Sequence, residues 1–171
     1  MKEYQNYIFD LYGTLVDIHT NEEKAYLWKN MAEIYSMMGA SYTTGELKKQ
    51  YKKLAREELE VTYVWMCREF GSRKLEKEEI EILIDNVFTQ LFREKNVEAA
   101  KEQIWQTGVV FRCLSTQYIK LFEGVPEMLS RLRKAGKKIY LLSNAQRMFT
   151  EPEMKMLDIY DSFDGILYSS D

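Results

Sequence analysis

Hydrophobic positions along the chain occur in two different patterns, one near the two ends and one in the middle. Residues 7–9 form a short run that is apolar on both faces and stops at Asp10. A run of this kind is typical of a strand buried from both sides in a parallel sheet. Similar short runs at 138–142 and 163–169 predict two further strands.

The middle of the chain repeats its apolar residues every three or four positions, which is the spacing of amphipathic helices. The first pattern starts near a cap, Thr20 or Asn21, and stops at Gly39. Three more patterns predict helices at 44–70, 77–95 and 97–118. Short loops between four helices favour a small antiparallel bundle.

Aromatic side chains are numerous in this helical region: Trp28, Tyr35, Tyr42, Tyr51, Tyr63, Trp65, Phe70, Phe88, Phe92 and Trp105. Large apolar rings at helical spacing favour a role in the core of the bundle. A second interpretation is that a few of them line a substrate pocket that faces Asp10.

The segments between the predicted strands also show helix signals. Pro126 suits the first turn of a helix that ends at Gly136. Thr150 and Glu153 form a capping-box pattern, which predicts that a second helix starts there. An order of strand, helix, strand, helix, strand implies parallel strands joined by right-handed crossovers. The sequence therefore predicts an α/β fold with a helical insert after the first strand.

Composition narrows the classes of function. The 171 residues carry a formal charge of −3, with Lys and Arg scattered among Glu, which argues against a nucleic-acid or anionic-membrane surface. No run reaches transmembrane length, and the polar start does not resemble a signal peptide. Cys67 and Cys113 lack a CxxC spacing and are expected to be buried free thiols in a reducing cytoplasm. The single histidine, His19, has no Cys or His nearby in sequence and is expected at the surface.

Asp10 is the first candidate for chemistry. It follows a buried-type strand, and Gly13 permits a sharp reversal directly after it. In open α/β sheets the carboxyl ends of the strands are where ligands bind, and an aspartate placed there can act as a nucleophile. Thr14 adds a hydroxyl group, and the loop from Leu11 to Thr14 can offer backbone amides to an anion. The same residues also fit an acid that merely ends a strand and caps a turn.

Two motifs favour the nucleophile over the merely structural interpretation of Asp10. The pattern Asp-x-x-Gly-Thr-Leu at residues 10–15 resembles the first motif of the haloacid dehalogenase-like (HAD) hydrolase superfamily, and residues 139–144 resemble its second motif, a strand that ends in Ser or Thr. The resemblance implies a doubly wound, Rossmann-like parallel sheet as the core, formed by residues 1–18 and 120–171. It also implies that residues 19–119 form a helical cap domain that selects the substrate.

The same resemblance implies roles for individual residues. Asp10 would be the covalent nucleophile, and Ser143 and Asn144 would bind the anionic part of a small substrate, together with Gly13 and Thr14. In a phosphatase, Mg²⁺ would be held by the Asp10 carboxylate, the backbone carbonyl of Tyr12 and a further acid. In a 2-haloacid dehalogenase no metal or other cofactor would be needed.

Tyr12 is the main departure from the phosphatase pattern, because phosphatases of the superfamily usually carry a second aspartate there as acid and base. A phenol ionises near pH ~10 and is a poor base near neutral pH. The sequence Leu-Tyr-Gly-Thr-Leu after Asp10, and Ser-Asn at the second motif, resemble the 2-haloacid dehalogenases more closely. Their cap arginine has no clear counterpart here, where Lys48 and Arg56 are the nearest cations.

The third and fourth motifs of the superfamily, a lysine and an acidic pair, have no counterpart in these 171 residues. We therefore expect an incomplete core, as in a truncated enzyme or one completed by another chain, and poor magnesium-dependent phosphatase activity. The alternative function is an inactive relative that acts as a binding module. The expected partner is a small anionic molecule, not a nucleic acid or a membrane, and the sequence leaves the oligomeric state open.

Overall fold

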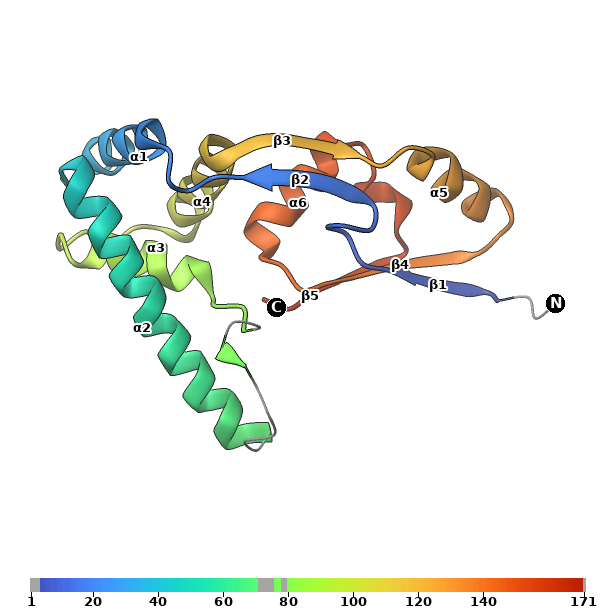
Figure 1. Ribbon diagram of the computed structural model, residues 1–171, viewed down its shortest axis with the longest axis horizontal. Helices are drawn as coiled ribbons and strands as arrows, with labels where there is room; N and C mark the ends of the chain where they lie inside the picture. Colours follow the sequence, from blue (N-terminus) through green and yellow to red (C-terminus); the bar gives the residue numbers. More distant parts are fainter. Residues whose placement is uncertain (1–3, 71–75, 78–79, 171) are drawn as a thin grey trace. The chain divides into compact units, whose positions relative to one another are not determined.

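The computed structural model describes residues 4–70, 76–77 and 80–170 (Figure 1). The chain forms two compact units. One consists of the residues up to Asn21 together with those from Thr116 onward, and the other of residues 22–115. The fold is α/β with a parallel sheet, as the sequence predicts.

The first unit is built on a three-stranded parallel sheet. Its strands are β1 (Asn6–Phe9), β4 (Lys138–Ser143) and β5 (Gly165–Tyr168), in the order β1-β4-β5. Phe9 lies opposite Leu141, and Leu141 lies opposite Ile166. All three predicted strands are therefore present, and the strands that carry the two motifs are direct neighbours.

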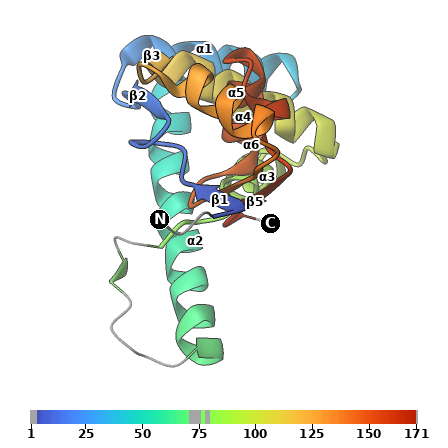
Figure 2. The same ribbon diagram turned by 90° about the vertical axis from the view of Figure 1, so that its right-hand side faces the viewer.

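Helices α5 (Val125–Lys134) and α6 (Arg147–Met156) lie on one side of this sheet (Figures 1 and 2). Each new strand is added on the same side of the one before it. Right-handed crossovers that advance in one direction place their helices on the same face, which explains the arrangement. Leu129 of α5 and Met154 of α6 pack in one core with the buried face of β4. The helix α6 begins three residues before Thr150, so the predicted start was wrong.

The other face of the sheet is exposed in the described part of the chain. Ile8, Leu142 and Leu167, one from each strand, have 57–68% of their surface accessible. The prediction that the first strand is buried on both faces was therefore wrong for these residues. A doubly wound sheet covers its second face with helices from strands added on the other side of the first strand, and the described residues add strands on one side of β1 alone.

A second, antiparallel pair of strands was not predicted. It consists of β2 (Val16–Thr20) and β3 (Thr116–Leu121). No strand was predicted for the first of these segments, and part of the second was predicted as the end of the fourth helix. The sequence of β2 is suited to a strand, because the β-branched residues Val16, Ile18 and Thr20 alternate with Asp17 and His19.

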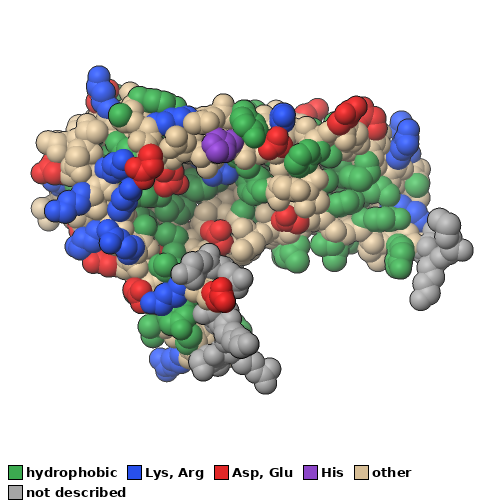
Figure 3. All heavy atoms as spheres, viewed as in Figure 1, with side chains coloured by type: hydrophobic (Ala, Val, Ile, Leu, Met, Phe, Trp, Pro, Cys, Tyr) green, Lys and Arg blue, Asp and Glu red, His purple; other side chains and the backbone are tan. Residues whose placement is uncertain are grey.

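Cross-strand contacts stabilise this ribbon. The Lys120 ammonium lies 3.3 Å from the Asp17 carboxylate, and the Tyr118 hydroxyl donates to the same side chain at 3.2 Å. His19 stacks on Tyr118 with 6.0 Å between ring centroids and lies on the surface, as predicted (Figure 3). Both strands belong to the first unit, and the helical unit consists of residues 22–115.

The second unit consists of four helices in its described residues: α1 (Ala25–Met37), α2 (Thr44–Phe70), α3 (Ile84–Arg93) and α4 (Lys101–Ser115). The bounds of α2 agree with the prediction. α3 begins at Ile84, after an extended Leu83, whereas the sequence suggested 77; residues 78–79 of that prediction lie outside the described part. Cys67 and Cys113 are free thiols as expected, but neither is buried, since Cys67 is half-buried and Cys113 is exposed.

Aromatic rings form the centre of the helical unit. The ring of Phe111 lies 5.2–5.8 Å from the rings of Trp28, Tyr51 and Phe88, measured between centroids, and all four side chains are buried. The interpretation of the predicted aromatic residues as core is confirmed for Trp28, Tyr51 and Phe88. Trp65 and Phe70, in contrast, are more than half exposed. No helix in the described ranges has the length and apolar content needed to cross a membrane.

We predict that Phe111→Ala lowers the free energy of unfolding of the helical unit by about 3–5 kcal/mol, because it leaves a cavity among three rings. All three tryptophans lie in this unit, so urea unfolding followed by their fluorescence measures the effect. Phe70→Ala is the matched control, since its ring is 69% exposed and its loss should cost less than about 1 kcal/mol. Equal effects of the two substitutions would contradict the assignment of Phe111 to the core.

A second prediction concerns acid. The ammonium groups of Lys48 and Lys52 lie 2.6–2.7 Å from Glu23 and lower the pKa of its carboxyl to about 2. Since the folded pKa lies below the unfolded value of 4.5, the contribution to stability is present above pH 4.5 and is lost as the pH falls towards 2. The stability difference between the native chain and Glu23→Gln should shrink over that window. NMR titration of the Glu23 carboxyl, with Lys48→Met/Lys52→Met as the control, checks the cause.

Candidate active site at the ends of the parallel strands

Asp10 follows the last residue of β1 and is exposed to solvent. The chain turns sharply after it, and the carbonyl of Leu11 accepts hydrogen bonds from the amides of Leu15, at 2.8 Å, and Val16, at 2.9 Å. Gly13 has a φ of 75°, in the left-handed region that favours glycine, which explains why the turn needs this residue. The turn therefore holds Asp10 at the carboxyl edge of the sheet.

Thr14 is the polar side chain that the turn brings to Asp10. Its hydroxyl donates to the Asp10 carboxylate at 3.4 Å, near the outer limit of such a bond. The backbone amides of Gly13 and Thr14 are directed elsewhere, to the carbonyls of Val16 at 2.9 Å and Leu11 at 3.3 Å. The predicted use of these two amides for an anion is not supported in this conformation, and Gly13 serves the turn.

Ser143 is the last residue of β4, and the pairing of Phe9 with Leu141 brings it beside the turn that follows β1. Its side chain is 2% exposed, and its hydroxyl has no hydrogen-bond partner among the residues that the structure describes, although its carbonyl accepts from the Ser169 amide at 3.0 Å. Buried hydroxyl groups without a partner are rare and need an explanation, such as a bound ligand. The next residue, Asn144, is exposed.

Tyr12 takes a different position from that expected of a catalytic acid or base. Its ring packs against the core of the first unit, and its hydroxyl donates to the Glu153 carboxylate and lies 3.2 Å from the Thr150 hydroxyl. Both α6 side chains are buried, with exposures of 8% and 0%. The tyrosine therefore ties the turn after Asp10 to α6.

Sequence reasoning missed Glu153 and Thr150 as neighbours of this turn and interpreted them as a helix cap. The available signal was their spacing of three, which places both on one face of a helix. The distance in sequence between Tyr12 and these residues hid the contact.

Magnesium was expected to bind the Asp10 carboxylate and the Tyr12 carbonyl in a phosphatase. Across residues 4–70, 76–77 and 80–170, no three His, Cys, Asp or Glu side chains come together as a metal site would require. Mg²⁺ is usually bound through one or two carboxylates, substrate oxygens and water. The described residues do not supply the predicted third ligand, so they do not by themselves fit the expected magnesium site.

The decisive observation on identity is a family model for haloacid dehalogenase-like hydrolases, which matches residues 4–171. The chain belongs to the haloacid dehalogenase-like hydrolase family. A search of curated proteins gave no match. Both motifs thus lie within the matched residues, and the matched family is a family of hydrolases.

Solved structures similar to this HAD-like chain include both dehalogenases and phosphatases. The L-2-haloacid dehalogenase of Xanthobacter autotrophicus is 17% identical, with 97% of this chain and 57% of that chain covered and a TM-score of 0.38. A protein of Haemophilus somnus described as a predicted phosphoglycolate phosphatase is 13% identical, with 98% and 64% covered and a TM-score of 0.39. YfnB of Bacillus subtilis, a HAD-type hydrolase bound to magnesium, is 18% identical, with 99% and 65% covered and a TM-score of 0.41. The chain thus spans less than two thirds of the length of each.

We predict that Tyr12→Phe destabilises the first unit by about 1–3 kcal/mol, because it leaves the buried Glu153 carboxylate and Thr150 hydroxyl without this partner. Hydrogen exchange of the β4 amides measures the loss within this unit. The control is Tyr4→Phe, since Tyr4 is 64% exposed and its hydroxyl should contribute little. Combining Tyr12→Phe with Glu153→Leu should recover part of the loss, because the pair is then removed together, and a purely additive result would contradict the contact.

Proposed function

We propose that this HAD-like chain is a hydrolase, or part of one, in which Asp10 attacks a small anionic substrate and forms a covalent intermediate. The observation that carries the proposal is the exposed carboxylate at the end of β1 beside the buried, unpartnered hydroxyl of Ser143 at the end of β4. A nucleophile and a hydrogen-bond donor at adjacent strand ends are what covalent attack on a bound anion requires.

Three polar side chains support binding of the anionic group. Ser143 can donate the hydrogen bond that its hydroxyl does not make within the protein, and Asn144 can donate from its exposed amide. Thr14 keeps the Asp10 carboxylate oriented through its hydroxyl. In this proposal the substrate carboxylate lies over the end of β4 and its reacting carbon faces Asp10.

A halogenated substrate fits these residues better than a phosphorylated one. Phosphoryl transfer would call for an acid and base beside Asp10, and the residue two positions on is Tyr12, whose hydroxyl is turned into α6. General acid–base catalysis contributes about two to four orders of magnitude in rate. Displacement of a halide needs no proton, because halide is a good leaving group without one. The role proposed for Tyr12 is therefore to position the turn, not to transfer a proton.

The reaction then has two steps. An oxygen of the Asp10 carboxylate bonds to the halogen-bearing carbon, and the carbon–halogen bond breaks as halide leaves with the electron pair. The product is an ester on Asp10. Water adds to the ester carbonyl, the bond from the carbonyl carbon to the substrate oxygen breaks, and a hydroxy acid and a proton are released. The first step requires only the nucleophile and the anion-binding groups.

We also propose that the helical unit, residues 22–115, acts as the cap that selects the substrate. Its insertion between the two motif-bearing strands supports this role, because a separately folded unit there can exclude water from a reaction at the strand ends.

The test is a covalent adduct. Incubation with 2-chloropropionate should release at least one equivalent of chloride per chain, and acid quenching during the reaction should trap one carboxyethyl group on the peptide that contains Asp10, as measured by mass spectrometry. Asp10→Asn should abolish the adduct. Asp17→Asn is the matched control, because Asp17 lies in β2 and pairs with Lys120.

A parallel assay with phosphate monoesters, with and without Mg²⁺, separates the two chemistries. Robust metal-dependent phosphate release by the native chain would overturn the halogen assignment. Formation of the adduct by Asp10→Asn would overturn the nucleophile. If neither substrate reacts and 2-chloropropionate still binds, as measured by calorimetry, the alternative of a binding module is favoured.

A further inference from the structure

The second half of α2 carries an apolar surface that the described residues of its unit leave exposed. The first half of the helix buries Leu47, Tyr51 and Leu54. Further on, Val61, Val64 and Trp65 are 53–65% exposed. Figures 1 and 2 show this half of α2 extending beyond the other helices of its unit. The apolar pattern of α2 therefore continues beyond the residues that pack in the core of the helical unit.

These exposed residues share one face of the helix. Val61, Val64 and Trp65 have the spacing i, i+3, i+4, and Glu57 and Arg68 lie four residues before Val61 and four after Val64. At 3.6 residues per turn all five therefore fall within about a third of the circumference. We call this set the α2 face.

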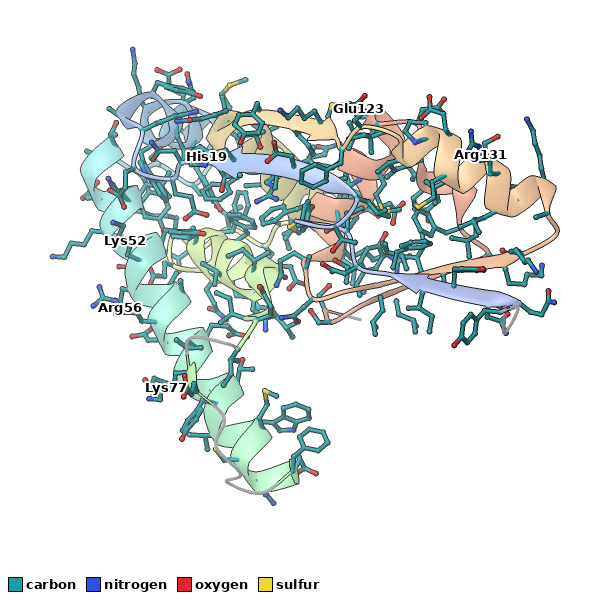
Figure 4. All side chains as sticks on the ribbon, turned by 45° about the vertical axis from the view of Figure 1, so that its right-hand side comes forward. His19, Lys52, Arg56, Lys77, Glu123 and Arg131 are labelled. Atoms are coloured by element: carbon teal, nitrogen blue, oxygen red, sulfur yellow. The ribbon has the colours of Figure 1, made fainter. Side chains whose placement is uncertain are left out.

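Another side of the same helix is occupied within the unit. Lys77 forms an ion pair with Glu60 at 2.6 Å and lies over the ring of Tyr63 at 4.9 Å (Figure 4). Glu60 and Tyr63 project from α2 at an angle well away from the centre of the α2 face. Leu47, Leu54 and Val61 follow one another at intervals of seven, so the α2 face continues the buried stripe of the first half of α2 into the part that is exposed.

The order of charges along the α2 face makes it self-complementary. If two copies of the helix run antiparallel with Val61 of one opposite Val64 of the other, every residue pairs with one equally far from the centre. Glu57 and Arg68 are each four residues from that centre pair, so Glu57 of one copy then lies opposite Arg68 of the second copy. Because the arrangement has two-fold symmetry, the contact between Glu57 and Arg68 occurs twice.

We propose that the α2 face binds the α2 face of a second copy of this chain, antiparallel and about a two-fold axis. The valines and the tryptophans form the apolar centre, which is where interface energy concentrates, and Trp is among the residues enriched there. The two Glu57–Arg68 pairs are exposed and add little affinity each, but they fix the register and disfavour a parallel arrangement.

The first test is the mass in solution of the full chain, measured by light scattering and sedimentation. The native chain should run at twice 20.4 kDa. Val64→Glu should weaken dimerisation at least about a hundredfold and give a monomer at the same concentration, because it places a like charge at the symmetric centre. Met37→Glu, at an 88% exposed position on α1, is the matched control and should leave the dimer intact.

The second test exchanges the charges. Glu57→Arg and Arg68→Glu should each weaken self-association, since each homodimer then carries two like-charge contacts. Mixing the two variants should restore a dimer that contains one of each, because both contacts are then of opposite charge. Glu57 also pairs with Lys53 of its own helix at 3.7 Å, so the mixed dimer is the outcome that isolates the contact between copies.

Two results would overturn the proposal. One is a native chain that stays monomeric at all concentrations measured. The other is a dimer that survives Val64→Glu and shows no preference for the mixed charge pair, which would place the contact elsewhere on the chain. Circular dichroism of each variant shows whether the helices are kept, and double exchange of Glu57 and Arg68 in one chain should restore the dimer if folding is unaffected.

Discussion

The pairing of β1 with β4 is the constraint on which the rest of the first unit depends. These strands are parallel neighbours although more than a hundred residues separate them, and their register aligns Phe9 with Leu141. Because parallel strands end at the same edge, this one ladder brings the acid after β1 and the serine at the end of β4 to the same place. The ladder decides which face of the sheet the helices can cover. It also decides at which edge the turn at Gly13 and the side chain of Tyr12 lie.

Much of this could be predicted because the signals are local. A short apolar run that ends in Asp10, and another that ends in Ser143, specify strands and their ends without knowledge of the remainder of the fold. Amphipathic spacing gave α2 its correct bounds, since a long helix has many repeats that agree. The parallel sheet followed from the order of elements, which leaves few allowed connections.

The parts that could not be predicted depend on partners far away in sequence. Val16 to Thr20 and Thr116 to Leu121 become strands because each supplies the other's hydrogen bonds, and neither pattern is long enough to show this alone. Thr150 and Glu153 match a capping box, yet the helix starts earlier and their side chains meet Tyr12. The exposure of Ile8 depends on which strands are added beside β1, which is a property of the whole sheet.

The insertion of the helical unit between β1 and β4 has a consequence for the order of folding. The unit is made of sequence-local contacts, which form quickly, whereas the β1–β4 ladder requires closure of a very long loop. A unit that folds first replaces that loop with a compact body whose ends are joined by the β2–β3 ribbon, and so reduces the entropy cost of the ladder. During synthesis β1 emerges before β4 and remains without this partner until β4 is made. The strand before Asp10 thus exists long before the partner strand on which its pairing depends.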